Sequence, residues 1–328
     1  FGNSIPTAEH AISMMMALAR QIPAADASTR AGKWEKSKFM GVELFGKTLG
    51  LIGAGNIGAI VADRAQGLKM KVVAFDPFLS PQRARDLGVE KVDLDTLLGR
   101  ADFITVHTPL TEGTRNLIDA AALEKCKTGV RIINCARGGI VDETALKDGL
   151  ESGKVAGAAL DVFVEEPARD NPLFALENVV ATPHLGAATE EAQENVALQV
   201  AEQMSDYLLT GAITNALNMP SISAEDAPRL QPYMALACQL GAFAGQVTES
   251  AIKSITMEFE GHVAKLNVKP LVQAALAEVM KPFSEAVNMV NAPVFARERG
   301  IDVSEVIHDR PGDYQTLIRL TLTTERFT

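Results

Sequence analysis

The chain has 328 residues, of which 47% are hydrophobic and 22% are charged, and its formal net charge at pH 7 is −10. This composition is typical of a globular protein, and the absence of a basic stripe argues against a nucleic-acid binder. Cys126, Cys135 and Cys238 are spaced neither as a zinc site nor as a disulfide framework, which favours reduced thiols in a cytoplasm. No apolar run reaches the ~20 residues that span a membrane. We therefore expect a cytoplasmic protein with no metal, membrane or nucleic-acid partner.

The first element in the chain is a predicted helix over residues 7–20, with Thr7 as its N-cap and Pro23 beyond its end. Residues 26–45 are polar and carry the only tryptophan, Trp34. An arm that packs on a neighbouring subunit is one interpretation of this segment, and the sequence leaves it open.

Apolar strands alternate with helical stretches from residue 47 to about residue 192. Strands that are apolar throughout and are joined by helices form a parallel sheet covered on both faces. The pattern therefore predicts an α/β doubly wound (Rossmann) domain. The expected strands are 48–53, 71–76, 102–107, 130–135, 155–161 and 178–183, and the expected helices are 57–69, 81–87, 93–99 and 142–152.

The rest of the chain has a different organisation. Thr189 begins a predicted helix over 189–210, and the Pro/Ser/Asn-rich segment 215–228 indicates a linker. Residues 229–328 read as a smaller α+β domain that is expected to be incomplete. The expected division is 1–192 for the Rossmann domain, 193–220 for the helix and linker, and 221–328 for the α+β domain.

A dinucleotide fingerprint lies in "TLGLIGAGNIG", where Gly53, Gly55 and Gly58 have the G-x-G-x-x-G spacing. A strand precedes the glycines, a helix follows, and the next strand ends in Asp76, about 20 residues further on. The glycines permit a tight turn, a close approach of the pyrophosphate and close helix packing. Because Asp76 would accept hydrogen bonds from the ribose and repel a 2′-phosphate, we expect NAD as the cofactor. The alternative is a glycine-rich turn that binds nothing.

Three further segments follow predicted strands and carry candidate catalytic side chains. Arg137 lies in "INCARGGIVDE", a Glu-Glu pair lies in "ALDVFVEEP", and His184 lies in "TPHLGAATEE". An arginine holds a carboxylate through two hydrogen bonds, and a histidine takes a hydroxyl proton near neutral pH. A carboxylate on the other ring nitrogen would fix the tautomer. The three segments together predict oxidation of a hydroxy acid, although each residue alone has an ordinary alternative as a loop or surface group.

Two other residues have a narrower interpretation. His107 is interpreted as structural or as lining the cofactor pocket, and Cys135 as a small lining group that is not a nucleophile. The remaining histidines, His10, His262 and His308, are interpreted as structural.

These motifs, with "GNSIPTAEH" and "ADFITVHTPLT", resemble the NAD-dependent D-2-hydroxyacid dehydrogenases almost end to end, and especially the long bacterial members of that family. The resemblance implies that Arg137 binds the substrate carboxylate, that His184 is the acid/base and that Glu166 is its partner. It also implies a homodimer or homotetramer. The NAD site that it implies, together with the fingerprint, comprises Gly53, Gly55, Asn56, Ile57, Gly58, Asp76, Thr108, Cys135, Asp161, His184, Gly186 and Ala187.

The resemblance also implies a function and two missing parts. The implied reaction is oxidation of 3-phospho-D-glycerate to 3-phosphohydroxypyruvate, the entry to serine synthesis. The implied effector-type domain is at 221–328, where His308 and Arg310 either bind an anionic effector or belong to a solvated loop, which is the favoured interpretation. The family's N-terminal lobe and C-terminal ACT domain are expected to lie outside this chain. A fragment that binds NAD and turns over poorly is therefore expected. The alternatives are a related glyoxylate or hydroxypyruvate reductase and an NAD-sensing, corepressor-like binding protein.

Overall fold

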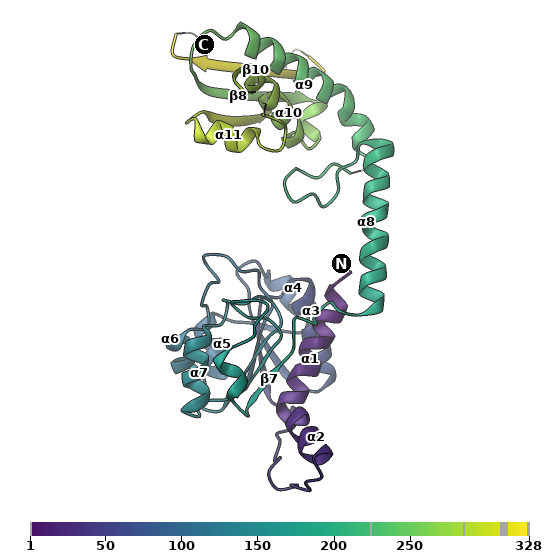
Figure 1. The fold of residues 1–328 in the computed structure, drawn as a ribbon. Helices are drawn as coiled ribbons and strands as arrows, with labels where there is room; N and C mark the ends of the chain where they lie inside the picture. Colours follow the sequence, from purple (N-terminus) through teal and green to yellow (C-terminus); the bar gives the residue numbers. More distant parts are fainter. Residues whose placement is uncertain (1, 224, 285, 309–313, 327–328) are drawn as a thin grey trace. The chain divides into compact units, whose positions relative to one another are not determined.

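The computed structural model describes residues 2–223, 225–284, 286–308 and 314–326. The chain divides into two compact units, residues 1–196 and 197–328 (Figure 1). Within the described residues, no helix combines the length and the apolar character needed to cross a membrane.

Within residues 2–196, the first unit is built on a parallel sheet of seven strands in the order β3-β2-β1-β4-β5-β6-β7. The order reverses between β1 and β4, and in open α/β sheets ligands bind at the carboxyl ends of strands beside such a switch point. The strands are β1 (Thr48–Ile52), β2 (Lys71–Phe75), β3 (Glu90–Lys91), β4 (Phe103–Val106), β5 (Val130–Asn134), β6 (Val155–Leu160) and β7 (Val179–Ala181).

Helices cover both faces of this sheet, and each face has its own apolar core. On one face α1 and α3 pack together against the sheet, and on the other face α5, α6 and α7 do so (Figure 1). The helices of the first unit are α1 (Ser4–Arg20), α2 (Ile22–Arg30), α3 (Asn56–Gly67), α4 (Pro81–Asp86), α5 (Leu94–Arg100), α6 (Ala120–Lys125), α7 (Glu143–Glu151) and the 3₁₀ helix η1 (Pro172–Ala175).

The predicted doubly wound fold is confirmed, with differences in detail. The sequence pattern missed the helix α2, the two-residue strand β3, the short helix α6 and the 3₁₀ helix η1. Thr7 is not an N-cap, because α1 begins at Ser4 and Thr7 is buried inside it. Pro6 is compatible with this earlier start, since the missing N–H of a first-turn proline would have had no partner there.

Helix α8 (Glu190–Thr210) begins after Thr189, whose hydroxyl accepts a hydrogen bond from the Ala192 N–H at 3.1 Å. The helix ends before Gly211, which has a φ of +75°. Part of the Pro/Ser/Asn-rich segment that follows is packed: Ile222 is buried and pairs with Ile213 in an isolated bridge.

Among the described residues of the second unit, three strands form a mixed sheet in the order β10-β8-β9. One face of β8 contributes Ile255, Met257 and Phe259 to cores shared with the helices. The elements are α9 (Ala227–Val247), β8 (Ile252–Gly261), η2 (Val263–Lys265), α10 (Lys269–Met280), η3 (Lys281–Phe283), α11 (Ala292–Glu298), β9 (Asp302–His308) and β10 (Thr316–Thr324).

Candidate active site

A cavity of about 770 Å³ lies at the carboxyl ends of β1, β4, β5 and β6 and beside the first turns of α1. Its lining includes Arg137 and eight of the residues predicted for the cofactor site. Those eight are Asn56, Ile57, Thr108, Cys135, Asp161, His184, Gly186 and Ala187. Gly53, Gly55, Gly58 and Asp76 are not among the lining residues.

The glycine turn between β1 and α3 leaves no space for side chains at two of its positions. Gly53 has a φ of +90°, and a Cβ on Gly58 would collide with the Gly53 carbonyl oxygen. A Cβ on Gly55 would meet nothing within 4 Å, so the backbone there is open to a ligand. Gly55 caps α3 without a side-chain hydrogen bond, which leaves helix N–H groups available to a phosphate.

Asp76, just beyond the end of β2, ties the glycine turn to the neighbouring strand. Its Oδ2 accepts a hydrogen bond from the Ala54 N–H at 2.9 Å, and its Oδ1 accepts one from the Phe78 N–H at 2.8 Å. Each carboxylate oxygen has a further lone pair, so both remain able to accept from ribose hydroxyls. Asp76 lines a second cavity of about 760 Å³.

Two polar atoms in the 770 Å³ cavity have no partner among the described residues. His107 uses Nε2 in a hydrogen bond of 2.9 Å with the Thr105 hydroxyl, which leaves its buried Nδ1 unpaired. The Thr108 hydroxyl is likewise buried and unpaired. Burial lowers the pKa of His107 to about 4, so the ring is neutral at physiological pH. Buried polar atoms are almost always hydrogen-bonded, so these two fit a polar ligand such as a dinucleotide.

Arg137 is presented by a turn that follows β5. The buried Asn134 side chain donates to the Arg137 carbonyl at 3.0 Å and accepts from the Ala136 N–H at 3.1 Å, which fixes the turn. A Cβ on Gly138 would collide with the Phe163 carbonyl, so this loop packs directly against the loop after β6. The Arg137 side chain is exposed, and its Nη1 donates to the Ala136 carbonyl at 2.6 Å.

The loops after β6 and β7 bring Glu166 and His184 together. His184 Nδ1 lies 2.8 Å from Glu166 Oε2, and Glu166 Oε1 accepts from the Phe163 N–H at 3.0 Å. Burial raises the pKa of Glu166, but the hydrogen bonds from His184 and Phe163 outweigh it and the net pKa is lowered. An ionised Glu166 requires a proton on Nδ1, which leaves Nε2 of His184 for a substrate.

Cys135 is buried in the same cavity wall. Burial and the nearby Asp161 charge raise the pKa of the Cys135 thiol. Since the thiolate is the reactive form, this residue is a small lining group without nucleophilic character.

Sequence patterns did not predict the part of the cavity that α1 lines. Asn3, Ser4 and Thr7 line it, whereas a helix starting at Thr7 would have left the first two in a loop. In the second unit, His308 Nε2 lies 3.6 Å from Glu258 Oε1. Arg310, the other candidate for effector binding, lies outside the described residues.

Two family profiles match the chain. The profile described as "D-isomer specific 2-hydroxyacid dehydrogenase, NAD binding domain" matches residues 12–186, and "D-3-phosphoglycerate dehydrogenase intervening domain" matches residues 229–328.

Relatives and solved structures agree with these matches. D-3-phosphoglycerate dehydrogenase of Synechocystis sp. is 47% identical over 98% of this chain and 58% of its own length, and that of Bacillus subtilis is 43% identical over 100% and 62%. The chain therefore spans about three fifths of the length of these curated relatives. A glyoxylate reductase structure from Paecilomyes thermophila is 35% identical with a TM-score of 0.62, covering 65% of each chain. The apo D-lactate dehydrogenase of Escherichia coli is 36% identical with a TM-score of 0.60, covering 65% of this chain and 67% of its own.

The first prediction concerns Asp76 and the ribose. In Asp76→Ala, the loss of a charged hydrogen-bond acceptor should lower the affinity for NADH by about tenfold. It should also remove the preference for NADH over NADPH. Asp76→Asn is the matched variant, because it keeps an oxygen for the Ala54 N–H but removes the charge. Both are measured by fluorescence titration of NADH and NADPH. Unchanged affinities for both cofactors in Asp76→Ala would show that the ribose is bound elsewhere.

The second prediction concerns the lowered pKa of Glu166. Below about pH 4.5 the unfolded chain protonates this carboxyl while the folded chain still holds it ionised, so its stabilisation is lost as the pH falls through the folded pKa. Glu166→Gln removes this contribution. As the pH is lowered from about 5 to about 3, the unfolding free energy of the variant should therefore fall less steeply than that of the wild type. Urea unfolding at stepped pH measures this, with Glu165→Gln as the control for removing one charge from the loop. Parallel curves for wild type and Glu166→Gln would contradict it.

Proposed function

The chain belongs to the D-isomer specific 2-hydroxyacid dehydrogenase family, and from this we propose that the whole protein oxidises 3-phospho-D-glycerate to 3-phosphohydroxypyruvate with NAD. The proposed place of this reaction is the cytoplasm, at the entry to serine synthesis. Two similarities support the proposed reaction. Relatives named D-3-phosphoglycerate dehydrogenase align with nearly all of this chain, and the intervening-domain profile matches residues 229–328.

The observation that carries the chemical part of the proposal is the 2.8 Å contact between Glu166 and His184, because His184 lines the same cavity as Arg137 while Glu166 lies behind it, in the lining of a neighbouring cavity. Arg137 would hold the substrate carboxylate through its guanidinium. His184 Nε2 would take the hydroxyl proton, and Glu166 would stabilise the resulting imidazolium through Nδ1–H. Bound NAD would accept the hydride that leaves the carbon bearing this hydroxyl group.

The residues that we propose for holding NAD are several that line the cavity, together with the glycine turn and Asp76 outside its lining. The glycine turn and the open N-terminus of α3 would take the pyrophosphate, and Asp76 would take a ribose. The unpaired His107 Nδ1 and Thr108 hydroxyl offer further polar contacts. Cys135, Asp161 and Gly186 would line the remaining wall.

A related reductase for glyoxylate or another 2-keto acid is the second candidate, because the glyoxylate reductase structure shares the fold and 35% of aligned residues. That structure covers only 65% of this chain. The second unit, residues 197–328, therefore favours the phosphoglycerate reaction.

We propose that this second unit binds an effector. Its sheet has a polar patch in which Glu258 of β8 lies 3.0 Å from Arg319 and 3.6 Å from His308.

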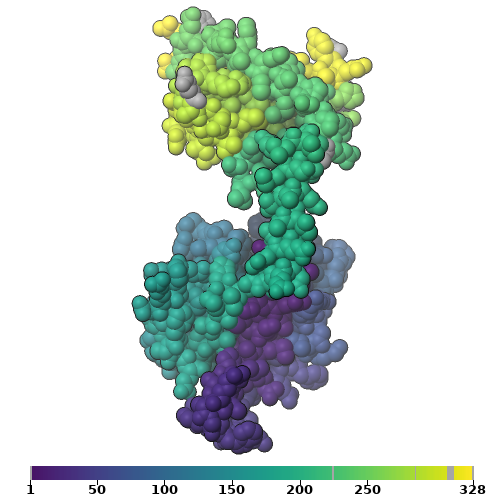
Figure 2. Space-filling view, turned by 45° about the vertical axis from the view of Figure 1, so that its right-hand side comes forward, coloured from purple at the N-terminus to yellow at the C-terminus, as the bar shows by residue number. Residues whose placement is uncertain are grey.

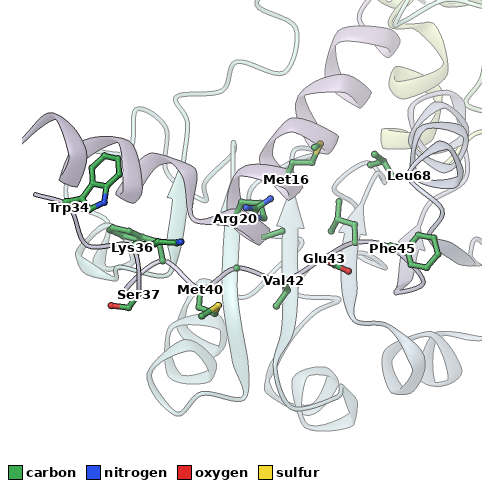
Figure 3. Close-up of a pocket in the computed structure, with 14 residues that line it drawn as sticks. Met16, Arg20, Trp34, Lys36, Ser37, Met40, Val42, Glu43, Phe45 and Leu68 are labelled. Carbon is green, nitrogen blue, oxygen red and sulfur yellow. The ribbon is translucent and has the colours of Figure 1, made fainter.

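The proposed partner is a second copy of the chain. In the first unit, α2 and the segment after it, dark purple, project from the sheet and its covering helices (Figures 1 and 2). A groove of about 1050 Å³ runs along residues 34–45 beside the end of α1 (Figure 3). Three large apolar side chains on it are strongly exposed: Trp34 at 87%, Met40 at 79% and Phe45 at 73%.

This apolar groove supports an interface, because soluble monomers seldom leave large apolar patches uncovered. Two copies of one chain pair most often through the same surface on each, related by a two-fold axis. We therefore assign the groove to the contact of a homodimer, which the complete protein would retain within any larger homo-oligomer.

The interface is tested by charge insertion. The double variant Trp34→Glu/Met40→Glu should shift the chain from dimer to monomer, since two charges would be buried without partners. Analytical ultracentrifugation measures the change, and Leu217→Glu, at an exposed apolar residue of the second unit, is the control. A wild-type chain that is monomeric at all concentrations, or a double variant that stays dimeric, would rule the groove out as the contact.

The reaction is tested in the complete protein. NAD reduction should be much faster with 3-phospho-D-glycerate than with D-lactate or glycolate. His184→Ala should lower kcat by about 100-fold or more, because general acid–base catalysis is lost, while NADH affinity stays nearly constant. His262→Ala is the matched histidine control. A mild loss of turnover in His184→Ala would remove His184 from the acid/base role.

A further inference from the structure

The loop that carries His184 has an unusual backbone that needs support. His184 has a φ of +56°, a region that residues with a Cβ adopt infrequently. Its N–H donates to the Asp161 carbonyl at 2.9 Å. Such a conformation persists only where the surrounding structure holds it in place. The position of the imidazole therefore depends on what fixes the residues on either side of it.

The carboxylate of Asp161 fixes both sides of this loop. Its Oδ1 accepts from the Thr182 hydroxyl at 2.6 Å and from the Leu185 N–H at 2.7 Å, and its Oδ2 accepts from the Gly186 N–H at 2.8 Å. The Asp161 side chain is 0% exposed. A buried carboxylate with these donors spans the loop from two residues before His184 to two residues after it.

His10, on α1, supplies the remaining partner of this carboxylate. Its Nε2 lies 3.2 Å from Asp161 Oδ1 and 3.1 Å from the Thr182 hydroxyl oxygen. The Thr182 proton already points to Asp161, so both neighbours of Nε2 present lone pairs. Nε2 must therefore carry a proton, because an unprotonated Nε2 would face two acceptors.

Helix α1 presents one side to the loop through His10 and its helical neighbours. Thr7, His10 and Met14 are spaced three and four residues apart, which places them on one face. The Thr182 hydroxyl lies 3.8 Å from Met14 Sδ, and a Cβ on Gly186 would lie 3.4 Å from Thr7. The loop thus lies beside α1 at both of its ends, Thr182 and Gly186, and His10 is the one of these three side chains that reaches Asp161.

The ionisation of Asp161 agrees with this arrangement. Burial raises the pKa of Asp161, but hydrogen bonds from His10, Thr182 and Leu185 outweigh it and the net pKa is lowered. An ionised Asp161 is an acceptor only, so it requires a donor in each of these directions.

We propose that His10 is a positioning residue, whose Nε2–H holds the Asp161 carboxylate and Thr182 in the arrangement that places the imidazole of His184 against Glu166. His10 touches neither substrate nor cofactor in this proposal, and it acts through Asp161. Its effect on the loop is independent of the proposed function, and only its effect on turnover rests on that function.

The loop is tested by amide hydrogen exchange in this chain, followed by NMR. His10→Leu removes the donor, and the Leu185 and Gly186 amides should exchange at least about tenfold faster, the size expected for losing a hydrogen bond to a charged group. Core amides of β1 and β4 should be unchanged. His10→Gln should restore protection, because its amide nitrogen reaches about as far as Nε2. Glu9→Gln, one residue away and exposed, is the control.

Turnover of the complete protein gives a second measurement. In His10→Leu, kcat should fall by about tenfold with a smaller change in the KM for NAD, and His10→Gln should recover most of it. Faster exchange in His10→Leu without any detectable dehydrogenase activity in the wild type would leave the positioning role intact and refute the proposed function. Unchanged exchange at Leu185 and Gly186 would overturn the role of His10.

The wild-type chain tests the same proposal if His10→Leu fails to fold. Nitrogen-15 NMR of the histidine rings should find Nε2 of His10 protonated, either as the Nε2–H tautomer or as the imidazolium. An unprotonated Nε2 with the proton on Nδ1 would overturn the proposal, because that ring nitrogen then holds neither Asp161 nor Thr182.

Discussion

The constraint on which the first unit depends is the parallel pairing of β1, β4, β5 and β6, which brings four strand ends to one edge of the sheet. The glycine turn, Arg137 and Glu166 follow three of these ends, and His184 follows the edge strand β7. Contacts between the loops then fix their spacing: Gly138 lies against Phe163, and Glu166 reaches His184. A site assembled in this way needs no contact between residues that are close in sequence.

Sequence patterns predicted those parts of the structure that local rules govern. The strands are apolar and short, and the glycine spacing follows from the steric demands of Gly53 and Gly58. The fold, and the edge of the sheet where the glycine turn lies, could therefore both be predicted from the sequence. The position of Arg137 and His184 at one cavity was also predictable, because the carboxyl ends of parallel strands lie at one edge of the sheet. The choice of Glu166 over Glu165 came from the family resemblance, since adjacent glutamates in a loop give no local reason to prefer either.

The features that sequence patterns missed depend on contacts between distant segments. His10 was interpreted as structural because nothing near it in the chain marks it, and its partners Asp161 and Thr182 lie far along the sequence. Asp161 was expected only to line the cofactor site, and nothing local indicates that its carboxylate supports the loop of His184. The unpaired Nδ1 of His107 likewise becomes visible only when the surrounding side chains are in place.

In the proposed complex, the glycine turn, Arg137 and the Glu166–His184 pair surround one bound dinucleotide. A crystal structure of this chain with NADH tests it most directly. The pyrophosphate should lie against Gly55 and the N-terminus of α3, with the nicotinamide in van der Waals reach, about 4 Å, of the cavity wall between Arg137 and His184. A nicotinamide bound away from His184, or a dinucleotide on the opposite rim of the sheet, would contradict the claim.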